Sequence, residues 1–215
     1  MVKKMGKEWL EICVQGFKNV IKTDDKLNQL RYKNSEGRKN MSIRFSQNFD
    51  ERLKFHGVQE PLQKSVSIDK ETVWDDHTSP FETKLIRTND LDEIKRLIGN
   101  DDKYFEDGSF KLPEMNLAVN LKEITHDNVK LAASAYVFGN SQEVKHLKSD
   151  IEKTIGSATI QLAAPSEVVI SAPLIIKGGE IKKLEADILT LKDNGQIYCE
   201  GTLAISAGLL RNLKK

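Results

Sequence analysis

SEVVISAPLIIKGGEIKKLEADILTLKDNGQIYCEGTLAIS, residues 166–206, is the stretch that decides the fold of the C-terminal half. With the residues just before it, it contains four strand-like runs, at about 157–163, 167–177, 180–191 and 195–206. The connections between the later runs contain Gly178-Gly179 and Asp193-Asn194-Gly195, which are strong hairpin signals. Because short connections pair sequential strands antiparallel, the sequence predicts an antiparallel β-meander.

A helix and a hairpin are predicted directly before these strands. Residues 141–155 form the helix, with Ser141 as its cap, Gly156 at its end, and one apolar stripe made of Val144, Leu147, Ile151 and Ile155. Upstream of it, apolar residues alternate over 117–121 and again over 129–137, and turn residues lie between them at 125–128. This alternation predicts two half-buried strands joined as a hairpin.

The N-terminal half is less regular. Apolar residues recur at helical spacing over 5–22 and predict an amphipathic helix. A short strand is expected over 41–45, a loop-rich stretch over 46–66, and a strand over 81–87. A short helix fits Leu91 to Ile98, with Asn89 or Asp90 as the cap and Gly99 at the end.

The predicted class is therefore α+β: an N-terminal amphipathic helix, a loop-rich middle, and a C-terminal antiparallel meander with one packed helix. Charge balance and regularity both change near residues 108–113, which suggests an N-terminal mixed region over 1–107 and a β-rich domain over 108–215. One continuous domain stays open as the alternative. The sequence presents no repeat of fixed period.

Composition favours a soluble, cytoplasmic globular protein. Of the 215 residues, 39% are hydrophobic and 30% are charged, which is within the globular range. The longest apolar runs, such as Val168 to Ile176, are about half the length of a membrane-spanning helix. Lys7, Glu8 and Glu11 interrupt the first apolar stretch, so no secretory signal is expected. Cys13 and Cys199 lie far apart and suggest neither a disulfide framework nor a metal site.

The charges are unevenly distributed. Residues 1–45 hold eleven Lys or Arg and five Asp or Glu, whereas residues 46–107 hold nine and fifteen. Two interpretations stay open: the segments pair with each other as solvated surface, or the basic one binds phosphates or acidic partners. Proteins that recognise nucleic-acid bases usually combine basic residues with aromatic ones. Tyr32 is the only aromatic residue within 18–39. We do not expect nucleic acid as a partner.

The densest polar cluster is Trp74-Asp75-Asp76-His77-Thr78-Ser79. Asp75, Asp76 and His77 are the weak candidates for a divalent metal site, and His77 is also a weak catalytic candidate. Adjacent residues of an extended chain point to opposite faces, so Asp75 and Asp76 could share a ligand only if the chain turns there. The alternative is a capped, solvated turn beside a buried Trp74. No cofactor is expected.

The C-terminal stretch resembles the closing meander of hot-dog domains, the fold of many acyl-CoA thioesterases. Gly178-Gly179, Asn194-Gly195 and Gly201-Thr202 stand at matching positions, and the helix over 142–155 precedes them. The resemblance covers about 50 residues. It implies that Asn140 and Glu143 lie near the family's site, but the family's catalytic His-Gly-Gly-like segment has no counterpart at 138–143.

These observations together predict a non-catalytic binding or assembly protein that uses a β-sheet surface. Meanders leave edge strands whose N–H and C=O groups need partners, and self-association is a common way of covering them. We therefore expect a protein partner, in the first place a second copy, and no membrane. The alternatives are a hot-dog acyl-thioester hydrolase or acyl-binding protein, and a nucleic-acid-associated factor that uses the basic N-terminal region.

Overall fold

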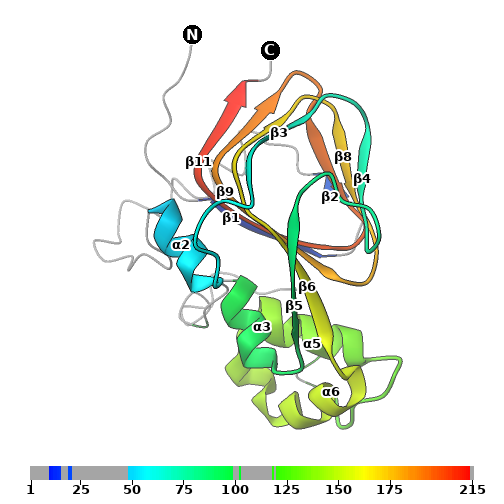
Figure 1. The fold of residues 1–215 in the computed structure, drawn as a ribbon. Coiled ribbons are helices and arrows are strands. Elements are labelled where there is room, and N and C mark those ends of the chain that lie inside the picture. The colour runs from blue at the N-terminus through cyan, green and yellow to red at the C-terminus, as the bar shows by residue number, and fades with distance from the viewer. Residues whose placement is uncertain are drawn as a thin grey trace, which may run out of the picture. The chain divides into compact units, whose positions relative to one another are not determined.

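The computed structural model describes residues 10–15, 19–20, 48–98, 102, 118 and 120–213 (Figure 1). It contains both helices and strands, which confirms the α+β class. The chain forms two compact units. The first consists of Met1–Lys84 and Leu162–Lys215, and the second of Leu85–Gln161. This division differs from the predicted one at 108–113, and each unit is described by itself below.

Most of the described part of the first unit is strand. Its two long strands are β9 (Ile181–Lys192) and β11 (Thr202–Leu213), which run side by side (Figure 1). The shorter ones are β1 (Leu10–Gln15), β2 (Asn19–Val20), β3 (Gln63–Ile68), β4 (Thr72–Trp74), β7 (Pro165–Ile170), β8 (Pro173–Ile176) and β10 (Gln196–Cys199). The boundary between the units falls within β5 (Thr83–Thr88) and β6 (Ala158–Ala163).

The strands of the C-terminal stretch pair in parallel, at a nearly constant spacing along the chain. Each residue of β9 lies beside the residue 21 positions later in β11, from Ile181 and Thr202 to Lys192 and Leu213. The offset is also 21 from β7 to β9, and it is 23 from β8 to β10. A chain that returns to its own flank every 21–23 residues winds as a short parallel β-helix, in which each coil stacks on the previous one.

Apolar side chains of successive coils stack inside this β-helix. They are almost fully buried and come from every side of the coil: Val66, Ile68, Trp74, Val168, Ile170, Leu174, Ile176, Leu184, Ala186, Leu189, Leu191, Ile197, Leu203 and Ile205. Because alternate residues of a strand point to one face, each strand needs only every second residue to be apolar. That requirement explains the alternation in the sequence.

The predicted antiparallel meander is therefore wrong. Gly178-Gly179 and Asp193-Asn194-Gly195 do make turns, but each turn leads the chain to the next side of the coil instead of back along the same sheet. Gly195 is required there because a Cβ at this position would overlap the carbonyl oxygen of Ile170 in the coil below. Two parallel neighbours need a long connection between them, and here the chain provides it by passing along another side of the coil before it returns.

The strands β1 and β2 occupy part of the stretch predicted as a helix. β1 pairs antiparallel with the first half of β11, and β2 pairs antiparallel with β10. The rest of 5–22, and the strand expected over 41–45, lie outside the described residues, so the helix as a whole stays a prediction. Leu10, Ile12 and Val14 also fit a period of two, so the apolar residues here suit a strand as well as a helix.

One helix of the first unit falls where a loop-rich stretch was expected. α2 (Phe49–Phe55) begins at Asn48, whose side chain accepts a hydrogen bond from the N–H of Asp50. Acidic residues follow in its first turn and basic residues in its last, as the helix dipole favours. Gly57, with φ of 67°, follows the end of the helix. The stretch 46–66 is therefore less loop-rich than predicted, because it contains this helix and, from Gln63, the start of β3.

The second unit interrupts the first coil. Gln63 pairs with Pro165, an offset of 102 positions, and β4 pairs with β8 at the same offset. The second unit, Leu85–Gln161, accounts for 77 of these positions, which leaves 25, close to the other offsets. The inserted residues thus explain why the sequence presents no fixed period.

Between parts of β5 and β6 at its ends, the second unit has four described helices: α3 (Leu91–Ile98), α5 (Val129–Phe138), the 3₁₀ helix η2 (Ser141–Leu147) and α6 (Lys148–Ile155). α5 contacts the other three. The predicted helix 91–98 is confirmed, and Val144, Leu147 and Ile151 of the predicted stripe are buried. The strand predicted over 129–137 is wrong: it is helix α5, because a helix buried on several sides also shows alternating apolar positions and its alanines favour helix.

Candidate functional site

The predicted cluster at 74–79 forms a turn. Trp74 is fully buried, and its ring contacts Phe81 edge to face at 4.8 Å between ring centres. Asp75 Oδ1 accepts hydrogen bonds from the backbone N–H groups of His77 (2.8 Å) and Thr78 (2.7 Å). These two hydrogen bonds hold the pKa of Asp75 below its usual value. The side chain of Asp75 therefore caps a turn beside a buried tryptophan, while His77 is exposed.

Asp76 points to a different set of partners. Its carboxylate accepts hydrogen bonds from the backbone N–H groups of Gly179 (2.8 Å) and Glu180 (3.1 Å) and from Lys182 Nζ (2.6 Å). Partial burial raises the pKa of Asp76, but Lys182 and the two N–H groups outweigh that effect and leave the pKa lowered. Asp75 and Asp76 therefore do not share a ligand, and the described residues contain no group of three or more His, Cys, Asp or Glu placed to hold a metal ion.

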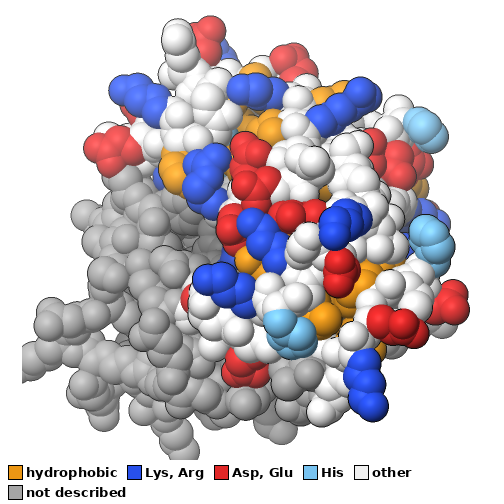
Figure 2. Space-filling view, turned by 90° about the horizontal axis from the view of Figure 1, so that it is seen from below, with side chains coloured by type: hydrophobic (Ala, Val, Ile, Leu, Met, Phe, Trp, Pro, Cys, Tyr) orange, Lys and Arg blue, Asp and Glu red, His pale blue; other side chains and the backbone are white. Residues whose placement is uncertain are grey.

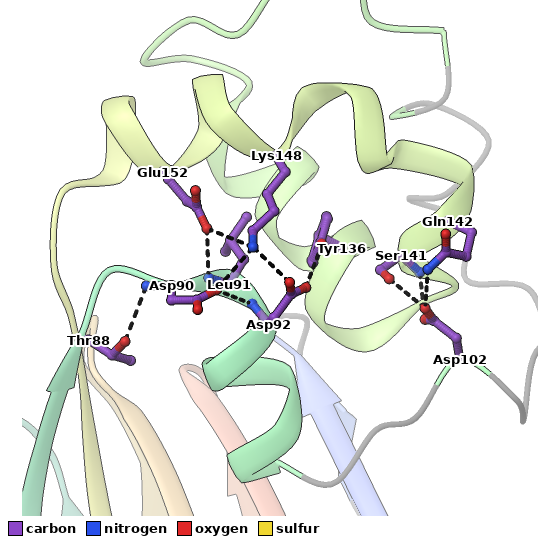
Figure 3. Close-up of polar contacts among 10 residues, drawn as sticks. All are labelled: Thr88, Asp90, Leu91, Asp92, Asp102, Tyr136, Ser141, Gln142, Lys148 and Glu152. Carbon is purple, nitrogen blue, oxygen red and sulfur yellow. Dashed lines mark hydrogen bonds and ion pairs between the residues drawn. The ribbon is translucent and has the colours of Figure 1, made fainter.

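Asn140 and Glu143 lie in the second unit, at the start of η2. The side chain of Asn140 accepts a hydrogen bond from the N–H of Gln142, so Asn140, and not the predicted Ser141, is the helix cap. Ser141 instead donates its N–H (2.7 Å) and its hydroxyl (2.5 Å) to Asp102 (Figure 3). Glu143 is half-buried.

The largest polar cluster of the second unit was not predicted. Lys148, at the start of α6, lies between the carboxylates of Asp92 (2.7 Å), Asp90 (3.1 Å) and Glu152 (3.5 Å) (Figure 3). Glu152 also accepts the N–H of Leu91. Residues from the start of α3 are thus tied to α6 through one ammonium group.

The charges around Lys148 indicate a structural contact that holds helices together. The hydrogen bond that Lys148 donates to Asp92, together with the other carboxylates, raises the pKa of Lys148 above its ordinary value. Burial and the hydrogen bond to Asp92 (2.6 Å) raise the pKa of Tyr136 in the same way. A lysine acting as base or nucleophile needs a lowered pKa. Lys148 and Tyr136 thus stay protonated, which suits holding helices together.

A buried lysine, Lys95, lies at the end of α5. Lys95 Nζ donates to the carbonyl oxygens of Tyr136 (3.1 Å) and Gly139 (2.5 Å), and it pairs with Asp102 at 3.1 Å. Carbonyl groups at a helix C-terminus lack partners within the helix, and a cation there also suits the helix dipole. Lys95 therefore stabilises the turn between α5 and η2.

The first unit holds a buried ionic cluster between α2 and β9. Arg52 Nε forms an ion pair with Glu185 Oε1, and Arg52 Nη2 donates to the carbonyl oxygen of Ala186 at 2.7 Å. His56 Nε2 lies 3.5 Å from Glu185 Oε2, and Lys183 Nζ lies 4.0 Å from the same oxygen. The side chains of Arg52 and Glu185 are 0% exposed.

The charge of Glu185 is stabilised by its neighbours. Burial raises the pKa of Glu185, but His56, Lys183 and Arg52 more than offset this, so the pKa lies below its ordinary value. An ionised, paired carboxylate under a helix fixes that helix in one position on the strand. Sequence reasoning missed this cluster because Lys183 and Glu185 alternate with the apolar residues of β9, a pattern that is typical of a solvent-facing side of a strand.

Four parallel strands form one side of the β-helix. They are β3, β7, the second half of β9 and residues 208–213 of β11, in this order. Among the described strands, β3 pairs only with β7 and is therefore an edge of this side. Lys64, Ser65 and Ser67 are exposed on β3, as are residues 211–213 on β11. Leu213 is 42% exposed.

Comparisons with protein-family models, with curated proteins and with solved structures find no significant match. Among the described residues, no helix is long and apolar enough to cross a membrane. Figure 2 shows acidic and basic side chains interspersed on the visible face, with hydrophobic side chains in small separate groups.

Proposed function

We propose that this protein is a non-catalytic binding or assembly protein that self-associates through strand edges of its β-helix. The carrying observation is the edge at β3, which among the described strands pairs with β7 alone. An edge strand presents N–H and C=O groups that a further strand can satisfy. A second copy of this chain offers such a strand with matching side-chain alternation.

The polar clusters support a structural role for the ionisable residues. Asp76 holds a turn, Lys148 ties helices together, and Glu185 pairs with cations under α2. Their pKa shifts favour the ordinary charged forms, whereas acid–base catalysis at neutral pH calls for values moved toward 7. These contacts account for the clusters without a substrate.

The two alternatives have less support. The hot-dog resemblance rests on turn glycines and alternation, which strands of another pairing also present, and β7, β9 and β11 pair in parallel. The basic residues of the nucleic-acid alternative lie within 18–39. Of this range the structure describes only the backbone of Asn19 and Val20, neither of which is basic. Neither alternative gains an observation of its own.

Light scattering coupled to size-exclusion chromatography tests the proposal. The molar mass of the full chain should exceed 24.3 kDa at micromolar concentration and should fall on dilution. A mass that stays at 24.3 kDa up to high micromolar concentration would contradict self-association.

A further inference from the structure

The two ends of the β-helix differ in how their strands are covered. At the last coil, β1 pairs with residues 202–207 of β11, and β2 pairs with Tyr198 and Cys199 of β10. Both of these pairs are antiparallel, whereas the coils pair with one another in parallel. β1 and β2 therefore act as a cap of the kind that a stack of repeats needs at its end.

The first coil has no such cap on β3 within the part of the chain that the structure describes. Lys64, Ser65 and Ser67 of this strand are exposed. A further copy that stacked on the last coil would need the flanks that β1 and β2 already occupy. The β3 end is therefore the end at which a second copy can stack.

From this difference, and resting on the proposed self-association, we infer that two copies form a closed dimer in which β3 pairs with β3. A contact between two identical edges is isologous and has a two-fold axis, so the two strands run antiparallel. The occupant of the edge is thus the β3 of a second copy. Because the contact uses this edge in both copies, assembly stops at two.

The alternation of side chains along β3 favours a register centred on Val66. Val66 is buried, whereas Ser65 and Ser67 are exposed. Opposite residues of an antiparallel pair point to the same face, so this register sets Val66 against Val66 and Ser65 against Ser67. The interior row stays apolar. The Lys64 side chains of the two copies lie at opposite ends of the joint, so no like charges meet.

Charges placed at Ser65 and Ser67 test the pairing. Lysine suits position 65 because its neighbour on β7 is Glu167. Ser65→Lys/Ser67→Lys sets lysine against lysine at two places in the joint, and we expect the dissociation constant of the dimer to rise about tenfold. Ser65→Lys/Ser67→Glu sets opposite charges there and should restore dimerisation.

A matched control keeps the added charge and moves it out of β3. Ser149→Lys/Ser157→Lys places two lysines at exposed positions of the second unit and should leave the dissociation constant unchanged. Circular dichroism and thermal unfolding verify that each variant is folded.

Cysteine substitution tests the register. Val66→Cys should form a disulfide between the copies under mild oxidation, because opposite residues of an antiparallel pair have Cα atoms about 4.5–5.5 Å apart. Ser67→Cys is more exposed but faces Ser65 of the second copy, so it should crosslink less. The wild type, which contains Cys13 and Cys199, gives the baseline. More crosslinking at Ser67→Cys than at Val66→Cys would contradict the register.

Sedimentation velocity over a range of concentrations separates the outcomes. A mass that rises to twice that of the monomer and stops, with the expected order of the charge variants, supports the dimer. A mass that grows past two copies overturns the closed dimer and leaves self-association standing. The same holds for a dimer that Ser65→Lys/Ser67→Lys does not weaken, or that Ser65→Lys/Ser67→Glu does not restore. A monomer at all concentrations overturns both.

Discussion

Lys182 Nζ donates a hydrogen bond of 2.6 Å to Asp76 Oδ1, although 106 residues separate the two. The side chain of Lys182 is 0% exposed and that of Asp76 is 28% exposed. Lys182 belongs to β9, and Asp76 belongs to the turn after β4. This ion pair therefore joins a coil formed before the inserted unit to one formed after it.

Replacing Asp76 should destabilise the first unit strongly. Asp76→Asn leaves the Lys182 ammonium buried without its counter-charge, and we expect a loss of about 3 kcal/mol in the free energy of unfolding. Urea unfolding measured by fluorescence of the buried Trp74 reports this unit. Asp69→Asn, at an exposed position just after β3, is the control. Equal effects of the two substitutions would contradict the role given to Asp76.

The same pair predicts a pH dependence. The pKa of Asp76 in the folded protein lies below the ordinary 3.8, so the folded state holds this proton less tightly than the unfolded state. Its contribution to stability is present above pH 3.8 and is lost as pH falls through the lowered pKa. The stability difference between wild type and Asp76→Asn should therefore shrink in acid. A difference that grows on acidification would contradict the assignment.

Gly178, which lies beside Asp76, and Gly156 should respond differently to substitution by alanine. Gly178 has φ of 93°, and a Cβ there would overlap the Asp76 carboxylate. Gly178→Ala should cost about 2–4 kcal/mol, since it adds a clash to an unfavourable backbone angle. Gly156→Ala meets a positive φ of 70° but no atom within 4 Å, so only about 1 kcal/mol should be lost. Thermal unfolding of both variants checks the order, and a larger loss for Gly156→Ala would contradict it.

Removing Glu185 tests the buried cluster under α2. Glu185→Gln leaves Arg52 and Lys183 buried without the carboxylate, and we expect a loss of about 3–5 kcal/mol in the free energy of unfolding. Glu167→Gln, at a half-buried position on β7, is the control and should cost far less. Denaturant unfolding of the two variants decides, and a loss below that of the control would contradict the account.

The sequence predicts most strands but not their partners. Alternation over 180–191 and 195–206 identifies which residues face the interior, and Leu184 and Ile205 are buried as expected. Alternation carries no information on whether a neighbouring strand is parallel. The turn at Asn194-Gly195 suits a hairpin and a coil corner equally well, so the winding becomes visible only through the 21-residue offset. That offset is hard to recognise because the second unit interrupts the first coil.

Part of the candidate sites could likewise be predicted from the sequence, and part could not. The local feature, a turn capped by Asp75 beside a buried Trp74, follows from neighbouring residues and could be anticipated. The contact of Asp76 with Lys182 depends on the winding of the chain and could not be anticipated. The same holds for Glu185 and Arg52, which are 133 residues apart.

Hydrogen–deuterium exchange at several protein concentrations tests the central claim most directly. Amides of Gln63–Ile68 should exchange more slowly as concentration rises, because an added strand protects the N–H groups that point out of the β3 edge. Amides of Tyr198 and Cys199, which pair on both flanks within one copy, should exchange at a constant rate. Exchange at β3 that is independent of concentration would contradict assembly through this strand.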